Sequence, residues 1–249
     1  MNSQTAPLLE VRNLSKHFGA VRALNDFSMV VRPGEVVALA GDNGAGKTTL
    51  IKAISGVYQP TAGEIILRGQ PVVFATPQEA RDKGIETIYQ DLALADNLSI
   101  GANIFLGREP MRKAFGFLPV LDRKKMAVAA KETMSRLDFH VSRLEAPVSN
   151  FSGGQRQAVA IGRAVYWDAQ ILIMDEPTAA LGVPEQRKVI SLIHQLKAQG
   201  RGVIFISHNL QDIFAVSDRI VVLRRGVQAG ERKIAETNHD EVVKLMVGG

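Results

Sequence analysis

Short runs of apolar and β-branched residues alternate along this chain of 249 residues with stretches whose apolar positions recur at helical spacing. This alternation predicts an α/β domain with a largely parallel central sheet. The first third follows mostly the strand pattern. Strands are predicted at residues 8–13, 27–31, 36–40 and 64–68, and later at 169–174, 202–206 and 219–223. Helices are predicted among and after the later strands, at residues 184–199, 209–216 and 239–247.

Turn and capping residues define two of the boundaries. Pro33 and Gly34 predict a turn between the second and third strands. Thr76, Pro77 and Glu79 have the pattern of a helix start, with a cap residue, a first-turn proline and a capping-box glutamate. A helix is therefore expected to begin there.

Residues 92–165 differ from the rest because their pattern is mostly helical. Asp122 is a candidate N-cap for a helix over residues 123–137. We predict a single domain over residues 1–249. In it, residues 1–91 and 166–249 form the core with an N-terminal antiparallel β subdomain, and residues 92–165 form an inserted helical subdomain.

Composition and charge exclude several classes of function. The chain has no cysteine, so disulfides, zinc–thiolate sites and thiol catalysis are excluded. Its first residues lack the pattern of a signal peptide, and its apolar runs fall far short of the roughly 20 residues that span a bilayer. We therefore expect any membrane role to act through a partner. The basic residues behind the net charge of +5 are scattered, the tightest group being residues 123–125, so nucleic-acid binding is not predicted.

A glycine-rich segment carries the first candidate chemistry. Residues 41–48 fit the pattern G-x-x-x-x-G-K-[ST], between the predicted strand 36–40 and a helical pattern over 49–55. Glycines let backbone N–H groups turn toward phosphate oxygens, and the helix N-terminus adds its positive dipole end. We expect Lys47 to reach the β- and γ-phosphates of a nucleotide and Thr48 to bind Mg²⁺. The predicted nucleotide-binding residues here are Gly41, Asp42, Asn43, Gly44, Ala45, Gly46, Lys47, Thr48 and Thr49.

The second candidate site for chemistry is an apolar strand that ends in two carboxylates. Asp175 and Glu176 follow the apolar run 171–174, and Pro177 ends the strand behind them. Ligands of open α/β sheets bind at this carboxyl edge. We expect Asp175 to join the Mg²⁺ shell and Glu176 to orient or deprotonate the water that attacks the γ-phosphate.

A second helix start is also suited to an anion. Ser152 is a good cap residue, and Gly153 and Gly154 expose backbone N–H groups where a helical pattern begins. This segment has neither the lysine nor the following Mg²⁺ ligand of the first loop. Its phosphate must therefore come from elsewhere.

Taken together, these motifs resemble the ABC ATPase family over nearly the whole chain and in the family's order. Ser152, Gly153, Gly154 and Gln155 match the family signature and would bind nucleotide, with Phe151 in place of the usual leucine. The resemblance implies a P-loop NTPase with a RecA-like core and a mostly parallel sheet. It also implies ATP and Mg²⁺ as cofactors.

The same resemblance assigns roles to three further residues. Gln90 is similar to the glutamine that touches Mg²⁺ and the attacking water, and His208 to the switch histidine that contacts the γ-phosphate. Phe18 is similar to the aromatic residue that stacks on adenine. The implied catalytic residues are Lys47, Gln90, Glu176 and His208. The implied metal ligands are Thr48, Gln90 and Asp175.

One segment departs from the family pattern. After the acidic pair the family usually reads S-A-L-D, whereas this chain has Ala179, Ala180, Leu181 and Gly182. Because this aspartate is missing, the sequence leaves open whether the segment transmits a signal between the two chains of a dimer.

Segments 43–47, 88–91, 103–109 and 178–182 resemble the ATPases of monosaccharide importers, with the single-domain, fructose-type variant favoured. This resemblance implies an ATPase that drives sugar import from the cytoplasmic face of the bacterial inner membrane. The implied partners are integral membrane permease subunits, indirectly a periplasmic sugar-binding protein, and a second copy of the chain in an ATP-dependent homodimer.

Other readings stay open. They are the ATPase of an exporter or of another solute importer, a heterodimer with a different ATPase, and an ABC protein that acts on nucleic acid or ribosomes. A switch GTPase is disfavoured, because the chain has no N-K-x-D guanine motif.

Overall fold

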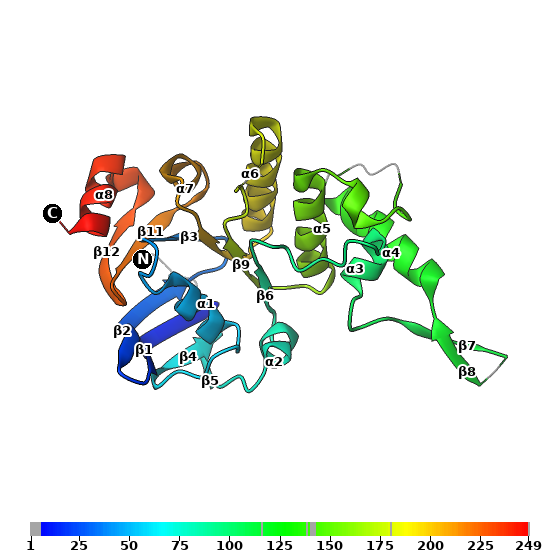
Figure 1. Cartoon of the computed structure of the whole chain (residues 1–249), viewed down its shortest axis with the longest axis horizontal. Coiled ribbons are helices and arrows are strands. Elements are labelled where there is room, and N and C mark those ends of the chain that lie inside the picture. Colours follow the sequence, from blue (N-terminus) through cyan, green and yellow to red (C-terminus); the bar gives the residue numbers. More distant parts are fainter. Residues whose placement is uncertain (1–5, 116, 138, 140–142, 180, 249) are drawn as a thin grey trace.

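The computed structural model describes residues 6–115, 117–137, 139, 143–179 and 181–248, and in these residues a six-stranded sheet forms the centre of the molecule (Figure 1). The strand order is β12, β11, β3, β10, β9, β6. Neighbours from β11 to β6 are parallel, and β12 runs antiparallel to β11. The bounds are β3 (Val36–Ala40), β6 (Ile85–Ile88), β9 (Ile171–Asp175), β10 (Gly202–Ile206), β11 (Arg219–Arg224) and β12 (Val227–Lys233).

Four of the parallel strands, β3, β9, β10 and β11, are largely apolar because both faces of this sheet are covered. In β3, Val37 and Leu39 belong to one hydrophobic core, and Val36, Ala38 and Ala40 to another. The same alternation runs through β9, β10 and β11. The sheet therefore separates two cores, and in these four strands the polar side chains are left to the ends. In β6, by contrast, Glu86 and Thr87 are buried in the middle of the strand.

One core lies between the large sheet and a smaller antiparallel sheet (Figure 1). The smaller sheet has the order β2, β1, β4, β5, and α1 packs into the same core. The elements are β1 (Leu9–Phe18), β2 (Val21–Val31), β4 (Ala62–Leu67), β5 (Gln70–Val72) and α1 (Lys47–Ile54), followed along the chain by α2 (Pro77–Asp82).

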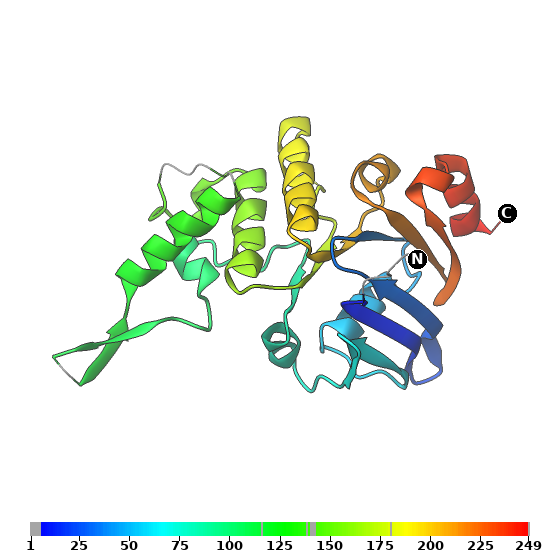
Figure 2. The same cartoon turned by 180° about the vertical axis from the view of Figure 1, so that it is seen from behind.

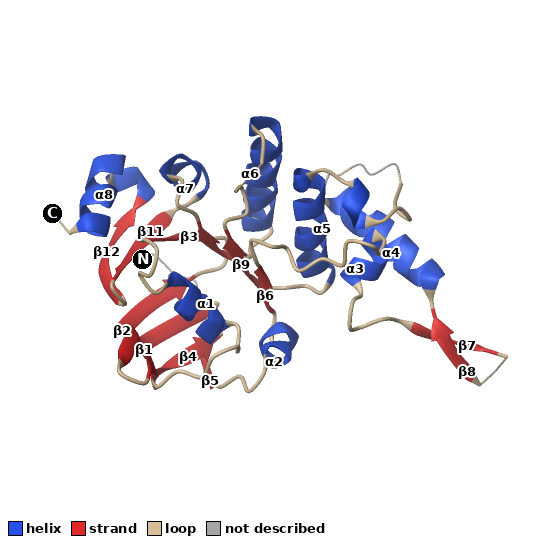
Figure 3. Ribbon diagram, in the orientation of Figure 1, coloured by secondary structure: helices blue, strands red, loops and turns tan. Residues whose placement is uncertain are grey.

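Helices cover the opposite face of the large sheet, as Figure 3 shows. These are α6 (Val183–Ala198), α7 (Leu210–Val216) and α8 (His239–Val247), with short 3-10 turns at η1 (Val148–Asn150) and η2 (Ile234–Glu236) elsewhere in the chain. Beyond β6 and α6 lies a lobe built from α3 (Ile100–Ile104), α4 (Arg123–Arg136) and α5 (Gly153–Tyr166). A hairpin of β7 (Met111–Ala114) and β8 (Leu118–Leu121) projects from this lobe.

The predicted α/β fold is confirmed, and strands 36–40 and 202–206 and the helix 239–247 have the bounds that the pattern indicates. Asp122 caps α4 by accepting from the Lys125 N–H at 3.0 Å. Thr76 caps α2, but the Glu79 carboxylate accepts from the N–H of Ala75, so the expected capping box forms one residue earlier.

Three features correct the sequence prediction. Strands β1 and β2 are longer than predicted and include several polar residues. The short β6 and the edge strand β12 have too little apolar pattern to be recognised. The β7–β8 hairpin interrupts a segment that the sequence predicts as mostly helical.

A buried arginine ties the two sheets together at the start of β11. The Arg219 guanidinium donates to Glu35 at 3.0 Å, to Glu231 at 2.6 Å and to the Val30 carbonyl at 2.5 Å. These partners lie in the turn between β2 and β3, in β12 and in β2. The two carboxylates hold the pKa of Arg219 above its ordinary value despite its burial.

Replacing Arg219 should therefore destabilise the whole fold. We expect Arg219→Met to lower the free energy of unfolding by about 3 kcal/mol, because it removes the buried cation shared by Glu35 and Glu231 and leaves Glu35 only the Arg32 guanidinium at 3.8 Å. Urea denaturation would measure this loss. As a control, Arg12→Met removes an exposed ion pair with Glu10 and should cost less than about 1 kcal/mol. Equal losses in the two variants would contradict the role of Arg219.

Candidate active site

The loop between β3 and α1 has a backbone that only glycine adopts easily. Gly41, Gly44 and Gly46 have φ values of +149°, +79° and +110°. A Cβ atom at Gly41 would collide with the Leu223 carbonyl, and one at Gly46 would lie 2.7 Å from the Ala23 carbonyl. The loop is therefore curled tightly against β11 and β2, as the motif predicts.

Lys47 begins α1, and its side chain folds back over this loop. The amine donates to the carbonyls of Gly41 at 2.6 Å and Asp42 at 3.1 Å. Gly46, the N-cap, supplies no side chain to the first amides of α1, which leaves them available to an anion. Thr48 is exposed and Thr49 half-buried in the same turn.

Asp175 and Glu176 lie at the carboxyl end of β9, as predicted. The Glu176 N–H donates to the Ile206 carbonyl at 2.9 Å, just beyond the pairing of β9 with β10. Glu176 has a φ of +51°, an unfavourable conformation for a glutamate. Strain of this kind is typical of functional positions.

Glu176 is held by a histidine from the next strand end. Its Oε2 atom lies 2.9 Å from Nδ1 of His208, which follows β10. The Glu176 side chain is 15% exposed and that of His208 is 78% exposed. The carboxylate is thus fixed in the site, whereas the imidazole has open space around it.

Asp175 is under electrostatic strain. Its pKa is raised above 3.8, first by burial and then by the charge of Glu176, while the charge of Lys47 lowers it. The loop follows β3 and the acidic pair ends β9, and both strands pair in parallel with β10, so the loop and the acidic pair lie at the same edge of the sheet. Asp175, Glu176 and Lys47 therefore meet at one edge of the sheet.

A buried hydrogen bond fixes the segment that leaves Glu176. The Thr178 hydroxyl donates to the Asp212 carboxylate at 2.7 Å, and both residues are buried. Asp212 belongs to α7, which begins two residues after His208. The segments that carry Glu176 and His208 are therefore joined by a second hydrogen bond in addition to the contact between Glu176 and His208. This pair is not predicted from the sequence, where its one signal is an acid in a short helix whose other buried residues are apolar.

Gln90 lies at the same edge of the sheet. It follows β6, which pairs in parallel with β9 so that Ile88 lies opposite Met174. Gln90 is exposed, two residues beyond the last paired position. The structure therefore brings Gln90 to the side of the sheet that carries Asp175.

Phe18 lies at the end of β1 and is part of a small aromatic surface. Its ring meets that of Tyr58, just after α1, edge to face at 5.2 Å. The Lys16 amine lies 5.1 Å from the Phe18 ring centre and 5.8 Å from that of Tyr58. Phe18 is 43% exposed, so one side of its ring is free to stack.

The signature segment forms the start of α5. Ser152 and Gln155 make a full capping box, in which the Ser152 hydroxyl accepts from the Gln155 N–H at 3.4 Å and Gln155 accepts from the Ser152 N–H at 2.9 Å. A Cβ atom at Gly153 would lie 2.8 Å from Leu181, and one at Gly154 would lie 2.7 Å from Glu185. The small size of these glycines lets the start of α5 lie close to Leu181 and to the first turn of α6.

The two helix starts belong to different parts of the molecule. Figures 1 and 2 show α1 beside the antiparallel sheet and α5 in the lobe beyond α6. Residues 179–182 are the segment that departs from the family pattern, and within it Ala180 lies outside the described residues. Gly182 is the N-cap of α6 without a side-chain hydrogen bond, a position where an aspartate would cap the helix.

The sheet order, the curled loop and the acidic strand end together define a P-loop ATPase. Residues 24–179 match the family model described as ABC transporter. The chain is 50% identical to the xylose/arabinose import ATP-binding protein of Sulfolobus acidocaldarius, covering 96% of this chain and 93% of that protein. It is 44% identical to a ribose import ATP-binding protein of Streptomyces avermitilis, covering 98% of this chain and 47% of that protein, so it spans about half of that relative's length.

A solved ATP-binding cassette of an ABC transporter has a TM-score of 0.83 to this chain at 26% identity, covering 97% of this chain and 99% of that one. The chain therefore belongs to the ABC transporter family, and it is one of the family's ATPases. No helix among its described residues combines the length and hydropathy that crossing a bilayer requires.

The strain on Asp175 predicts a pH-dependent stability. Because the folded-state pKa is raised, the favourable contribution of this group is present below 3.8 and is lost as pH rises through the folded-state pKa. Asp175→Asn should therefore raise the free energy of unfolding at neutral pH, and its advantage should shrink toward acid pH.

Chemical denaturation over a pH series would measure this difference. Glu64→Gln, at an exposed position of β4, is the control and should show no such trend. If the gain in the free energy of unfolding of Asp175→Asn stayed constant with pH, the raised pKa of Asp175 would not be the source of the strain.

Proposed function

We propose that this chain binds and hydrolyses ATP to drive the import of a monosaccharide through a membrane permease. The observation that carries the proposal is the meeting of Lys47, Asp175 and Glu176 at one sheet edge, with Glu176 held by His208. We infer a monosaccharide as the solute from the relatives, which are described as import ATP-binding proteins for xylose/arabinose and for ribose. A fructose-like sugar stays a prediction.

The curled loop would hold the phosphates of ATP. Its backbone N–H groups and the first turn of α1 face an anion, and the Lys47 amine would leave two loop carbonyls for the β- and γ-phosphates. Gly41, Asp42, Asn43, Gly44, Ala45 and Gly46 form this phosphate cradle, and Phe18 would stack on adenine beside Tyr58.

The residues at the sheet edge suit a magnesium ion. Thr48, Asp175 and Gln90 offer a hydroxyl, a carboxylate and an amide oxygen, which are hard donors of the kind that Mg²⁺ prefers. The ion would neutralise charge on the β- and γ-phosphate oxygens. The raised pKa of Asp175 fits this role, because a cation would relieve the repulsion between Asp175 and Glu176.

Glu176 and His208 would divide the remaining chemistry. The fixed Glu176 carboxylate would orient the attacking water and accept its proton. The exposed His208 ring would turn from Glu176 toward the γ-phosphate once ATP is bound, and donate to it. The Thr178–Asp212 bond keeps the backbones of both segments in place during this rearrangement.

The signature helix would complete the site of a second copy. Ser152, Gly153, Gly154 and Gln155 form an anion-binding helix start that is distant from the loop of the same chain. Two chains arranged head to tail would put each signature on the ATP of the other, so the dimer would form with ATP and open after hydrolysis. A solved bacterial ABC transporter cassette is described as dimeric.

A groove beside Gln90 is suited to the permease. It is a cavity of about 240 Å³ whose lining includes Pro77 and Arg81 of α2, Tyr89, Arg108 and Trp167. It lies between the core and the α5 lobe, next to the segment 91–104. The chain would thus sit on the cytoplasmic face of the membrane against the permease, with a sugar-binding protein on the other side.

Replacing Glu176 by glutamine tests the catalytic assignment. Glu176→Gln should still bind ATP but hydrolyse it about 100-fold or more slowly, because the base is lost while the shape survives. The variant should then accumulate as an ATP-bound dimer, visible by sedimentation with and without ATP and Mg²⁺. Lys47→Ala is the matched control and should give neither hydrolysis nor dimer. Unchanged turnover in Glu176→Gln, or a monomer under saturating ATP, would contradict the proposal.

Replacing His208 separates chemistry from binding. His208→Ala should slow turnover by about 100-fold with little change in ATP affinity, because its contact forms with the γ-phosphate as the reaction proceeds. Single-turnover hydrolysis and a fluorescent-nucleotide titration would measure the two effects. A variant with weaker ATP binding but normal turnover would rule out the switch role.

A further inference from the structure

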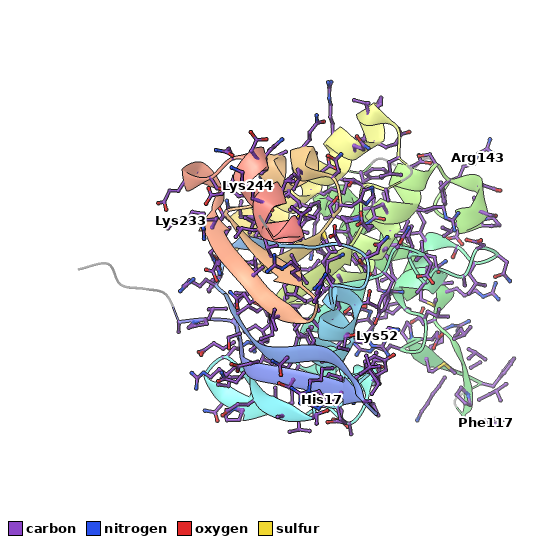
Figure 4. The ribbon with its side chains drawn as sticks, turned by 60° about the vertical axis from the view of Figure 1, so that its left-hand side comes forward. His17, Lys52, Phe117, Arg143, Lys233 and Lys244 are labelled. Carbon is purple, nitrogen blue, oxygen red and sulfur yellow. The ribbon has the colours of Figure 1, made fainter. Side chains whose placement is uncertain are left out.

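The β7–β8 hairpin ends in two aromatic rings that no described residue covers. Phe115 is 90% exposed and Phe117 is 79% exposed. Figure 4, which labels Phe117, shows this end of the hairpin clear of the body of the protein. The strands also expose Met111, Leu118 and Leu121. Exposed apolar groups gathered at one place mark an interaction site.

The aromatic residues do not serve the fold of the hairpin. The strands pair from Met111 with Leu121 to Ala114 with Leu118, and neither ring belongs to a hydrophobic core of the described residues. Phe115 has a φ of +51°, where a bulky side chain is unfavourable and glycine or asparagine would fit better. Folding alone therefore gives no reason for an aromatic residue at this tip.

Positive charge flanks the tip. Arg112 and Lys113 in β7, and the group 123–125 at the start of α4, are exposed and form no ion pair within the part of the chain that the structure describes. Of the acids nearby, Glu109 accepts from the Gly107 N–H at 3.0 Å and Asp122 caps α4, and Glu145 lines the same cavity as Arg123. The surface that the hairpin presents is apolar at the end and basic behind it.

The hairpin is also on the side of the molecule that the proposed function assigns to the membrane. Arg108 lines the permease groove, where it lies 4.8 Å from the Trp167 ring centre, and β7 begins three residues later. In Figures 1 and 2 the hairpin and α2 both extend to the lower side of the molecule, away from the upper ends of α5 and α6. Four residues of strand and the turn reach about 15 Å beyond the lobe.

We propose that the Phe115 and Phe117 rings insert into the headgroup region of an anionic lipid bilayer, with the flanking basic residues on the lipid phosphates. Aromatic rings at the interface and basic side chains against anionic lipid are the usual means of peripheral attachment. A protein partner fits less well, because a specific interface buries about 800 Å² on each side and a hairpin tip offers little of that. The orientation rests on the proposed function; the lipid contact does not.

Vesicle flotation of the purified full chain tests the lipid contact. We expect binding to vesicles of equal parts phosphatidylcholine and phosphatidylglycerol, weak binding to phosphatidylcholine alone, and release by high salt. The double variant Phe115→Ser with Phe117→Ser should lose at least about 10-fold in binding to the anionic vesicles. Arg112→Gln with Lys113→Gln should lose binding to the anionic vesicles only.

Two controls keep the result interpretable. Val73→Ser changes an apolar side chain of similar exposure on another part of the surface and should bind vesicles like the unchanged protein. Lys47→Ala should also bind vesicles normally, and the hairpin variants should keep ATP hydrolysis in the absence of lipid, so this proposal and the ATPase proposal fail separately. Equal flotation of the double phenylalanine variant and the unchanged protein would overturn the lipid contact. The lipid contact would also be overturned if the protein did not float with the anionic vesicles and the hairpin bound the permease instead.

Discussion

Burial of the large sheet on both faces is the constraint on which the rest of the structure depends. Because alternate residues of β3, β9, β10 and β11 fill two separate cores, the charged groups of these strands lie at their ends, as Arg219, Arg224 and Asp175 do. Polar chemistry can begin only where the strands end. The phosphate loop follows β3, the acidic pair ends β9, and His208 follows β10. Three segments that are far apart in sequence therefore become neighbours through strand order alone.

Bringing these groups to one edge of the sheet destabilises the folded state locally. Two adjacent carboxylates, one of them with its pKa raised by burial and by its neighbour, repel each other when the site is without a cation. Glu176 also keeps a left-handed backbone. The pairing of its N–H with β10 and the Thr178–Asp212 bond offset this strain, since both tie the segment to buried structure. The site is thus held in an arrangement that ATP and a cation would relax.

The parts that could be predicted from sequence are those whose information is local. The bounds of β3 and β10 are clear because each is a continuous apolar run between turns. The phosphate loop could be recognised because its glycines, lysine and threonine lie within eight consecutive positions. The edge strand β12 has a mixed sequence, since an edge strand buries little, and its pattern carried no signal.

Long-range pairs could not be predicted for a different reason. Thr178 and Asp212 are separated by 34 positions, and nothing in either neighbourhood specifies the other. The contact of Phe18 with Tyr58 is of the same kind. The hairpin was missed because its apolar residues face solvent and have no core to set their period. Sequence patterns report burial, and these features depend either on exposure or on the packing of distant elements.

The glycines of the signature have a second consequence for how the protein works as a dimer. Gly153 packs against Leu181, which lies five residues after Glu176, and Gly154 packs against Glu185 in the first turn of α6. In the proposed head-to-tail dimer, Glu176 serves the ATP bound by its own chain, whereas Gly153 and Gly154 serve the ATP of the partner. These close contacts therefore join the signature helix to the segment that follows Glu176 within each chain. In such a dimer, a movement of the Glu176 segment in one site would change the packing of the signature helix in the other. Leu181, which the chain keeps although the aspartate after it is absent, makes one of the two contacts, and Glu185 makes the other.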